Sequence, residues 1–472
     1  MRCIIKGHDF LYEIQTVSQI FYPNERFILT DAPSGSGLTV ESVLINEEII
    51  SRAYVDGALS AEDIGRAGAR GKSELKRSVC AGMYRALQTL TGYAGPWGML
   101  TGVKPTKLIR ELLDKNYSEA EIFEYINREY FTDASKIRLC LDAALAGRAA
   151  AEAICGETAS LYIGVPFCAS RCLYCSFTSY EINKYRAGDY LDALYLEMKA
   201  AGPFFNKKKL DAVYIGGGTP TALGENDFAA LLDRVAENFD TANAYEYTVE
   251  AGRPDTITRE KLRAMKIRGV TRVSINPQTM NDGTLALIGR GHSSKEYTDC
   301  VASARDRGFT NINSDIIMGL PGETAEHAIR TAEALGETDP EGIAVHTLAV
   351  KRASRLRGEL SEHRLPDNAE TGKMLAIARE HCEKMGMRPY YMYRQKNMSG
   401  NFENVGYSKK GYECIYNIRM TEERQTVVAL GAGGATKIFY EPENRIERIV
   451  NVKDPGEYIK RIDETAERKR SL

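Results

Sequence analysis

The chain has 472 residues, of which 43% are hydrophobic and 27% charged, as in an ordinary globular protein. Its formal net charge of -2 at pH 7 argues against a broad electrostatic surface for nucleic acid or an anionic membrane. No apolar run reaches the roughly 18 residues of a membrane span, and the start MRCIIKGHDF lacks the pattern of a signal peptide. We therefore expect a cytoplasmic protein with no membrane span and no nucleic-acid partner, in a compartment where thiols stay reduced.

Residues 1–155 are predicted to form an N-terminal α+β region that is helical in its second half. The first part contains β-rich pieces, such as RFILT and LTVESVLI, separated by the loop signal APSGSG. The second part has helical periodicity, as in SELKRSVCAGMYRALQTL. The only tryptophan, Trp97, lies in GPWGMLTGVKPTK, where we expect it to pack in a core.

Residues 156–350 alternate short apolar runs with helical segments, which indicates βαβ units and a parallel sheet. We predict an α/β fold, a partial (β/α) barrel of about six parallel strands. In such a fold the carboxyl ends of the strands carry the chemistry. The predicted strands are SLYIGV, LDAVYIGGG, AYEYTVEAG, VTRVSINPQ, TNINSDIIMGL and EGIAVHTLAV.

Residues 351–472 are predicted to form a small C-terminal α+β region covering the substrate side. A helical segment around TGKMLAIAREHCEKMG is followed by a tyrosine-rich stretch and by VVALGAGGATKIF. A tyrosine cluster of this kind is typical of an amphipathic packing surface.

Three cysteines, Cys168, Cys172 and Cys175, stand directly after the first predicted strand in VPFCASRCLYCSF. Thiolates suit zinc, copper(I) or iron–sulfur clusters. A [4Fe–4S] cluster held by three cysteines keeps one iron open, and S-adenosylmethionine can chelate that iron. The alternatives are a zinc site completed by a distant ligand, or three buried thiols. The position after a strand, Tyr174 before the third cysteine and the glycine run after the second strand favour the cluster.

The stretch YIGVPFCASRCLYCSF resembles the radical S-adenosylmethionine family, and within it the oxygen-independent coproporphyrinogen III oxidase branch. Further similar elements follow in order: GGGTPT, SINPQTMNDGTLALIGRGHS and NSDIIMGLPGET. The N-terminal region with WGMLTGVKPTK resembles that of HemZ-type coproporphyrinogen dehydrogenases.

The resemblance implies a [4Fe–4S] cluster on Cys168, Cys172 and Cys175, with the fourth iron open to S-adenosylmethionine, and it leaves open whether a second molecule binds. No catalytic residue beyond these cofactors is assigned. Asp315 stands out because a charge in an apolar strand is costly unless it is paired. The residues implied to surround S-adenosylmethionine are Tyr162, Tyr174, Gly217, Gly218, Thr219, Glu250, Gln278, Arg290, Asp315 and Ala349.

The activity implied by the resemblance is oxidative decarboxylation of coproporphyrinogen III to protoporphyrinogen IX by a 5′-deoxyadenosyl radical, in porphyrin and haem biosynthesis. A flavodoxin or ferredoxin is the implied electron donor. Arg352, Arg388 and Arg394 are candidates for binding the carboxylates of this tetrapyrrole substrate.

Two departures from the family pattern keep other functions open. Phe177 stands where the best-known oxidases have a fourth cysteine, and the N-terminal region differs from theirs. A haem chaperone on the same cluster-containing scaffold, with His292 or His346 as haem ligand, is one alternative. A radical methyltransferase acting on a tetrapyrrole is another. The long N-terminal region favours the oxidase, although its role and the oligomeric state stay open.

Overall fold

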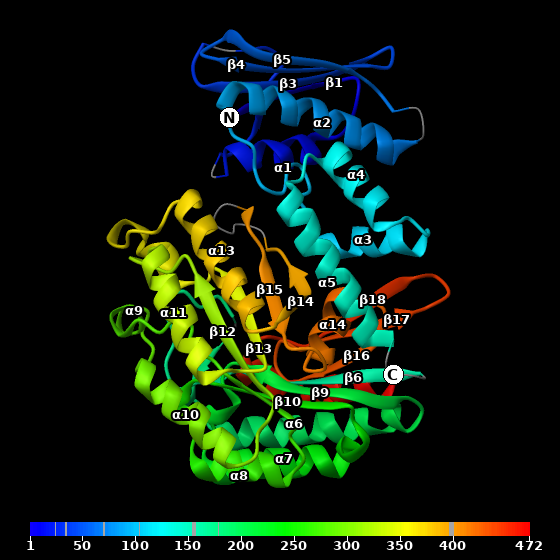
Figure 1. Cartoon of the computed structure of the whole chain (residues 1–472). Coiled ribbons are helices and arrows are strands. Elements are labelled where there is room, and N and C mark those ends of the chain that lie inside the picture. The colour runs from blue at the N-terminus through cyan, green and yellow to red at the C-terminus, as the bar shows by residue number, and fades with distance from the viewer. Residues whose placement is uncertain are drawn as a thin grey trace. The chain divides into compact units, whose positions relative to one another are not determined.

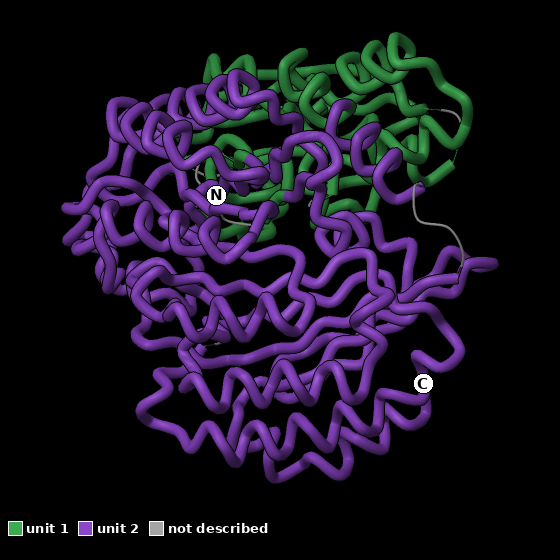
Figure 2. Tube along the Cα trace, turned by 60° about the horizontal axis from the view of Figure 1, so that its bottom comes forward, with its two compact units in different colours: residues 1–141, 394–402 green, residues 142–393, 403–472 purple. Residues whose placement is uncertain are grey.

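A computed structural model describes residues 1–23, 25–33, 35–68, 71–102, 104–152, 157–177, 179–395 and 401–472. These residues form two compact units, shown in Figure 2. The first contains residues 1–141 and 394–402, and the second contains residues 142–393 and 403–472. The boundary at residue 141 falls within one long helix, Ala134–Glu152.

The first unit contains a five-stranded sheet with the order β2-β1-β3-β4-β5. Helix α2 packs against β4 and β5, and α1 packs against α2 (Figure 1). The strands are β1 (Arg2–Lys6), β2 (Ile28–Leu29), β3 (Leu38–Ile45), β4 (Glu48–Val55) and β5 (Ala58–Arg66). The helices are α1 (Leu11–Phe21), α2 (Lys72–Thr91), α3 (Pro105–Asp114), α4 (Glu119–Tyr130) and the start of α5 (Ala134–Glu152).

Local sequence explains the hairpins of this sheet. The turn between β3 and β4 has positive φ at Asn46 (48°) and Glu47 (67°), and the turn between β4 and β5 has it at Asp56 (50°) and Gly57 (82°). Two consecutive residues with positive φ match the right-handed twist of the flanking strands. The α+β character of the region is as predicted, but helix α1 was not predicted.

The second unit contains an eleven-stranded sheet with the order β14-β15-β13-β12-β11-β10-β9-β6-β16-β17-β18. The central strands are β6 (Thr158–Val165), β9 (Lys209–Gly217), β10 (Glu246–Gly252), β11 (Arg272–Ile275), β12 (Ile312–Met318) and β13 (Gly342–Thr347). All five pairings within this group are parallel. The six predicted strands and the α/β fold are therefore confirmed, and among the described residues the two ends of the sheet do not pair into a closed barrel.

Helices follow the strands and cover the outer face of the sheet (Figure 1). They are α6 (Ala187–Ala201), α7 (Glu225–Asn238), α8 (Arg259–Ile267), α9 (Asp282–Leu287), α10 (Ser294–Asp306), α11 (Ala325–Thr338) and α13 (Asn368–Lys384). The short helix α12 (Arg355–Gly358) is instead bonded to the loop that follows β6, through Leu356 and Leu173. None of the helices within the described ranges has the length and apolarity needed to cross a membrane.

Residues after 351 extend the same sheet at both edges. Strands β14 (Arg388–Tyr393) and β15 (Asn404–Ser408) join antiparallel beyond β13, while β16 (Val427–Leu430) pairs parallel with β6 and continues into β17 (Ala435–Tyr440) and β18 (Arg445–Val450). Between and after them lie α14 (Ile415–Glu422), α15 (Pro455–Lys460) and α16 (Ile462–Arg470). That residues 1–155, 156–350 and 351–472 form separate domains remains a prediction.

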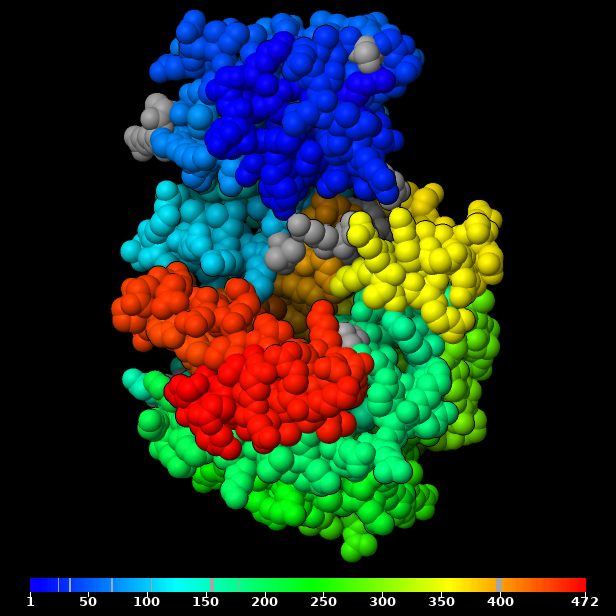
Figure 3. Space-filling model, turned by 180° about the vertical axis from the view of Figure 1, so that it is seen from behind, coloured from blue at the N-terminus to red at the C-terminus, as the bar shows by residue number. Residues whose placement is uncertain are grey.

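The C-terminal helix α16 is anchored by a buried charge. Lys469, 1% exposed, donates to the Ala429 carbonyl at 2.9 Å, and its Nζ lies 3.6 Å from a carboxylate oxygen of Glu197 on α6. Figure 3 shows the C-terminal residues in red at the surface beside the blue-green residues that include α6. Helix α16 therefore links strand β16 to helix α6.

Candidate functional site

The three predicted thiols lie on one loop at the carboxyl end of β6. Cys168 is in the short strand β7 (Phe167–Cys168), which pairs with β8 (Tyr180–Glu181). Cys172 is 7% exposed, Cys168 and Cys175 are half-buried, and all three thiols are free. A turn in which the Cys175 N–H donates to the Cys172 carbonyl at 3.2 Å brings the last two together.

Other βα connections hold this cysteine loop by its backbone. The Leu173 N–H donates to the Ile288 carbonyl at 2.9 Å, and its carbonyl accepts from the Leu356 N–H at 3.0 Å. Arg253, 3% exposed, donates to both the carbonyl (3.2 Å) and the hydroxyl (2.6 Å) of Ser170, within the C-x3-C segment. The loop is thus positioned by segments that follow β10, β11 and β13.

Arg253 is itself fixed by Asp255 through two bonds of 3.0 and 2.8 Å. Although burial acts to raise it, the Arg253 guanidinium holds the pKa of Asp255 below its ordinary value. Sequence reasoning did not name Arg253. The available signal was a charged RPD run at the end of the third predicted strand.

Replacing Arg253 by methionine is expected to free the cysteine loop at Ser170 and to reduce the iron that the protein retains after anaerobic reconstitution by roughly 10-fold or more, as for other supporting partners of metal ligands. Arg253→Lys should restore part of this retention. Arg259→Met, on the exposed start of α8, is the matched control. Iron and sulfide per chain and the electron paramagnetic resonance spectrum provide the measurement. Equal iron content and identical spectra in R253M and R259M would contradict the positioning role.

The glycine run after β9 lies against the cysteine loop. The Gly218 N–H donates to the Val165 carbonyl at 2.8 Å, and the Thr219 N–H donates to the Phe167 carbonyl at 2.7 Å. A Cβ on Gly218 would lie only 2.5 Å from the Phe167 carbonyl oxygen, and Gly217 has φ +110°. The Thr219 hydroxyl lies 3.6 Å from the Cys168 sulfur. Glycine is therefore required here for close approach of two backbones.

The interior of the barrel is open at one level of the sheet. On each of strands β6, β9, β10, β12 and β13 one residue is partly exposed although both of its neighbours in the strand are buried. Since alternate residues of a strand face opposite sides, these residues share the inner face and border a space inside the barrel. We call them the lumen residues: Tyr162, Tyr214, Glu250, Asp315 and His346.

Tyrosines fill one side of this interior. The rings of Tyr162, Tyr214 and Tyr416 stack on one another with centroids 4.5 to 6.2 Å apart. Tyr390 and Tyr391 belong to the same cluster. The tyrosine-rich stretch is thus a packing surface, as expected, and it packs against the inner wall of the barrel.

Glu250 faces Asp315 and His346 across the lumen. Burial and, next, the charge of Asp315 raise the pKa of Glu250, the Gly217 N–H and His346 act to lower it, and the net pKa is about 7. A carboxyl group in a cleft whose pKa lies near neutral pH is typical of a functional site. A cationic group entering the lumen would favour its ionised form.

Glu250→Gln is expected to change the pH dependence of stability. The folded pKa lies above the ordinary value of 4.5, so from pH 4.5 to 7 the folded state binds more protons than the unfolded state and loses stability as pH rises. The neutral amide removes this loss. The variant should equal the wild type at pH 4.5 and exceed its stability by about 3 kcal/mol at pH 8, at about 1.4 kcal/mol per pKa unit. Urea denaturation at both pH values measures this, and an equal difference at both would refute it.

Asp315 has protein partners for its charge. Its carboxylate accepts from the side-chain amides of Asn313 at 2.7 Å and Asn276 at 3.0 Å, and His346 Nε2 lies 3.8 Å away. Asn313 is bound in turn by Arg272 at 3.1 Å. The partners that the sequence leads us to expect for the Asp315 charge are therefore Asn313, Asn276 and His346. They hold its carboxylate at the lumen.

Arg290 lies close to the Cys172 thiol, and Gln278 is bonded to the lumen strand β12. Gln278, at the end of β11, has φ +69°, and its backbone bonds both Asp315 and Ile317 of β12. A non-glycine residue in this region is strained, and such strain gathers at functional sites. Arg290 donates to the Asn276 carbonyl at 2.5 Å and lies 3.8 Å from the Cys172 sulfur.

The other residues predicted from the sequence are Tyr174, Ala349 and the two candidate haem ligands, and they lie on several different segments. Tyr174 packs beside Leu173, and burial, together with the charge of Cys172, raises the pKa of its hydroxyl. Ala349 is half-buried two residues beyond β13. Of the predicted haem ligands, His292 is only 6% exposed, whereas His346 faces the lumen.

The three arginines considered for substrate carboxylates differ in accessibility. Arg352 and Arg388 are exposed. Arg394 is 3% exposed, lies 5.0 Å over the ring of Trp97 and donates to the Leu100 carbonyl within the first unit. The guanidinium of Arg394 is therefore part of a core, and its candidacy was wrong.

The donor set fits an iron–sulfur cluster better than a single metal ion. Within the described residues, no three His, Cys, Asp or Glu side chains converge on one point as ligands of one ion do. In a cluster each thiolate binds a separate iron, so the sulfurs need not converge. Burial and the neighbouring thiols raise the pKa of Cys168 and Cys175, so their ionisation calls for a bound cationic group. The Arg290 Nε is buried without a hydrogen-bond partner in the described part of the chain, as a bound anion would require.

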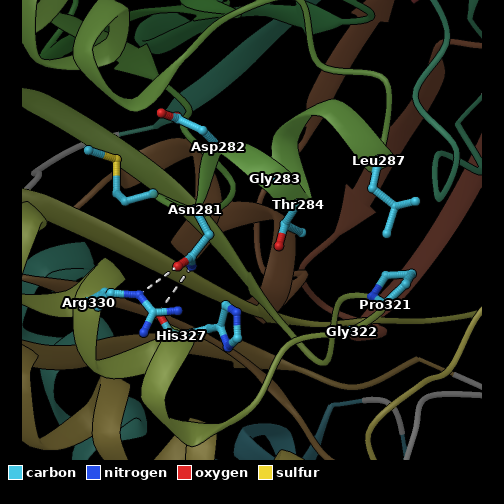
Figure 4. Close-up of a pocket in the computed structure, with 10 residues that line it drawn as sticks. Asn281, Asp282, Gly283, Thr284, Leu287, Pro321, Gly322, His327 and Arg330 are labelled. Atoms are coloured by element: carbon cyan, nitrogen blue, oxygen red, sulfur yellow. Dashed lines mark hydrogen bonds between the residues drawn. The ribbon is translucent and has the colours of Figure 1, made fainter.

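A second opening lies apart from these residues. Figure 4 shows a pocket of about 520 Å³ beside α9 and α11, where the Arg330 Nε donates to the Asn281 side chain at 3.0 Å. Asn281 donates in turn to the His327 carbonyl at 3.2 Å. None of the predicted cofactor residues lines this pocket.

Comparisons with known proteins agree with this site. The model of the radical SAM superfamily matches residues 162–335. The chain is 37% identical over 404 residues to the oxygen-independent coproporphyrinogen-III oxidase-like protein HemZ of Bacillus subtilis, covering 84% of this chain and 80% of that protein. It is 33% identical to the haem chaperone HemW of B. subtilis, covering 58% of this chain and 69% of that protein. Coproporphyrinogen III oxidase HemN of Escherichia coli has the same fold, with a TM-score of 0.55, 22% identity and coverage of 68% and 73%.

The chain therefore belongs to the radical SAM superfamily and, within it, to the family of the oxidase-like protein HemZ. Members of the superfamily use a [4Fe–4S] cluster and S-adenosylmethionine, and these are the cofactors of this chain.

Proposed function

We propose that this chain catalyses the oxygen-independent oxidative decarboxylation of coproporphyrinogen III to protoporphyrinogen IX in haem biosynthesis. The observation that carries the proposal is a three-thiol loop at the rim of a lumen that contains ionisable side chains. Its kinship with an oxidase-like protein over 84% of the chain supports the choice of substrate.

The cofactors, when bound, supply a 5′-deoxyadenosyl radical that removes a hydrogen atom from the substrate. Two propionate side chains each lose a hydrogen atom to this radical and then carbon dioxide and one electron, leaving vinyl groups. The electron passes to an external one-electron acceptor. In this proposal Cys168, Cys172 and Cys175 hold the cluster. S-adenosylmethionine lies against the glycine run 217–219 and Glu250.

In the proposal, different residues contact different chemical groups of S-adenosylmethionine. Arg290 supplies a cation for the carboxylate of S-adenosylmethionine, and Glu250 supplies an acceptor for its ammonium group. Gln278 and Asp315 offer hydrogen-bonding groups to the adenosyl part. Tyr162, Tyr174 and Ala349 complete the surrounding wall.

Lys351 is suited to hold a substrate carboxylate. It is half-buried, four residues beyond the end of β13, and burial lowers the pKa of its ammonium group. Within the described ranges no carboxylate is paired with it. A propionate placed beside it would supply the missing negative charge.

A haem chaperone is the second candidate, because HemW proteins match 58 to 64% of this chain. An oxidase releases a decarboxylated tetrapyrrole, whereas a chaperone binds haem and passes it on unchanged. Anaerobic incubation with reductant, S-adenosylmethionine and coproporphyrinogen III, followed by mass spectrometry, distinguishes them. Loss of two carboxyl groups coupled to 5′-deoxyadenosine supports the oxidase. Tight haem binding without decarboxylation supports the chaperone, and deoxyadenosine alone indicates another substrate.

A further inference from the structure

The cysteine loop carries an exposed aromatic side chain next to its last thiol. Phe177 is 68% exposed, whereas most large apolar side chains of the described barrel are buried. Its N–H donates to the Cys175 sulfur. An exposed aromatic ring therefore stands two residues from a proposed cluster ligand.

Arginines surround the same loop. Arg171, on the loop itself, donates to the Ala353 carbonyl at 2.6 Å, and its positive charge acts on the Cys175 thiol. The loop is also bonded to α12 at Leu356. The segment from residue 351 to α12 therefore lies beside the thiols, and it presents the exposed cations Arg352, Arg355 and Arg357.

Few carboxylates offset this charge. Glu359 lies 3.5 Å from Arg355, an i, i+4 pair of largely exposed side chains that is worth little. No such ion pair of Arg352 or Arg357 is seen within the described ranges. A local excess of positive charge on a chain of net charge -2 indicates a specific acidic partner. It is too small a surface for the footprint of a nucleic acid.

We propose that this surface, Phe177 with Arg171, Arg352, Arg355 and Arg357, docks a small acidic electron-transfer protein that reduces the cluster. The inference rests on the proposed cluster site. The partner gives up one electron and the cluster gains it, with no bond made or broken. Encounters of redox proteins are weak and small, and complementary charge governs their rate. The exposed ring supplies the apolar centre of such a contact.

The test uses the reconstituted protein and reduced flavodoxin, an acidic flavin protein, as probe. The double variant Arg352→Glu with Arg357→Glu changes the charge of the surface by four units. Its rate of cluster reduction, followed by bleaching of the visible absorbance, should fall about 10- to 100-fold at low salt. The difference should vanish near 1 M salt, where the screening length is about 3 Å.

Controls separate docking from damage to the site. Photoreduced 5-deazaflavin, a small neutral reductant, should reduce the wild type and the variant equally. Lys207→Glu with Lys209→Glu lies at the amino end of β9, whereas the cysteine loop follows the carboxyl end of β6, so this variant should leave the flavodoxin rate unchanged. Phe177→Ser should slow reduction without changing its salt dependence. Binding of flavodoxin to each variant, measured by calorimetry, is the second readout.

Several outcomes would overturn the proposal. Equal flavodoxin rates in wild type and variant would show that these arginines do not dock the donor. Slower reduction by deazaflavin as well would show damage to the cluster. A wild type without cluster absorbance would remove the site on which the inference depends. No tetrapyrrole is present, so failure of the decarboxylase proposal alone leaves this test intact.

Discussion

Replacing Cys172 by alanine is expected to abolish the iron–sulfur cluster and the production of 5′-deoxyadenosine. Cys172 lies at the centre of the loop, 7% exposed, beside Arg290 and Tyr174. Removing even a side chain that only supports a metal ligand lowers metal affinity or activity by about 10–100-fold, so loss of a ligand itself should lower them by more than about 100-fold. Iron content, visible absorbance and deoxyadenosine formation with a chemical reductant measure the effect.

Cys300→Ala is the matched control for this experiment. Cys300 is 8% exposed on α10 and is not one of the three loop thiols. Both substitutions remove a small buried thiol, so both should destabilise the cluster-free protein to a similar small extent. Retention of a full cluster in C172A, or loss of it in C300A, would mean that the cluster ligands have been misassigned.

Gly218→Ala is expected to have the second-largest effect, because its added methyl group meets backbone atoms. Its Cβ would lie 2.5 Å from the Phe167 carbonyl oxygen and 2.9 Å from the Phe167 carbon and nitrogen. Overpacking of this kind costs about 1–3 kcal/mol. Relief requires that the end of β9 separate from β7, which carries Cys168. We therefore expect lower stability, less retained iron and weaker binding of S-adenosylmethionine.

Gly188→Ala, near the start of α6, has no atom within 4 Å of the added Cβ and provides the comparison. It should be neutral or slightly stabilising, by about 0.4–1 kcal/mol. Denaturant unfolding, iron content and isothermal titration of S-adenosylmethionine measure both variants. The close-approach argument fails if G218A binds cluster and ligand as G188A does.

Local patterns were sufficient to predict the six parallel strands, because buried strands of a βα fold read as continuous apolar runs. The strand additions at the sheet edges were not predicted. Val427 pairs with Ser160, 267 residues earlier, and neither segment contains a sign of the other. Helix α1 was missed for a related reason. Its segment is short and lies between strand signals, and packing against α2 stabilises it.

The cysteine spacing and the glycine run gave the candidate site its outline, since both are contiguous in sequence. Contacts between side chains that are far apart in the sequence could not be predicted, because only the fold brings them together. The Arg253 bonds to Ser170 span 83 residues, and the pairing of His346 with Asp315 joins neighbouring strands. Arg394 is a residue for which the sequence misled: its charge suggested an exposed ligand contact, but its guanidinium lies in a core over Trp97.

The pairing of β6 with β16 has a consequence for synthesis in the cell. The ribosome makes β6 well before its outer neighbour, because Val427 of β16 follows its partner Ser160 by 267 residues and the anchoring Lys469 of α16 comes later still. At about 5–20 residues per second, one edge of β6 stays unpaired for roughly ten seconds to a minute. An open parallel strand edge is a template for wrong pairing. Pairing along this edge of β6, the strand that leads into the cysteine loop, therefore waits until β16 has been synthesised.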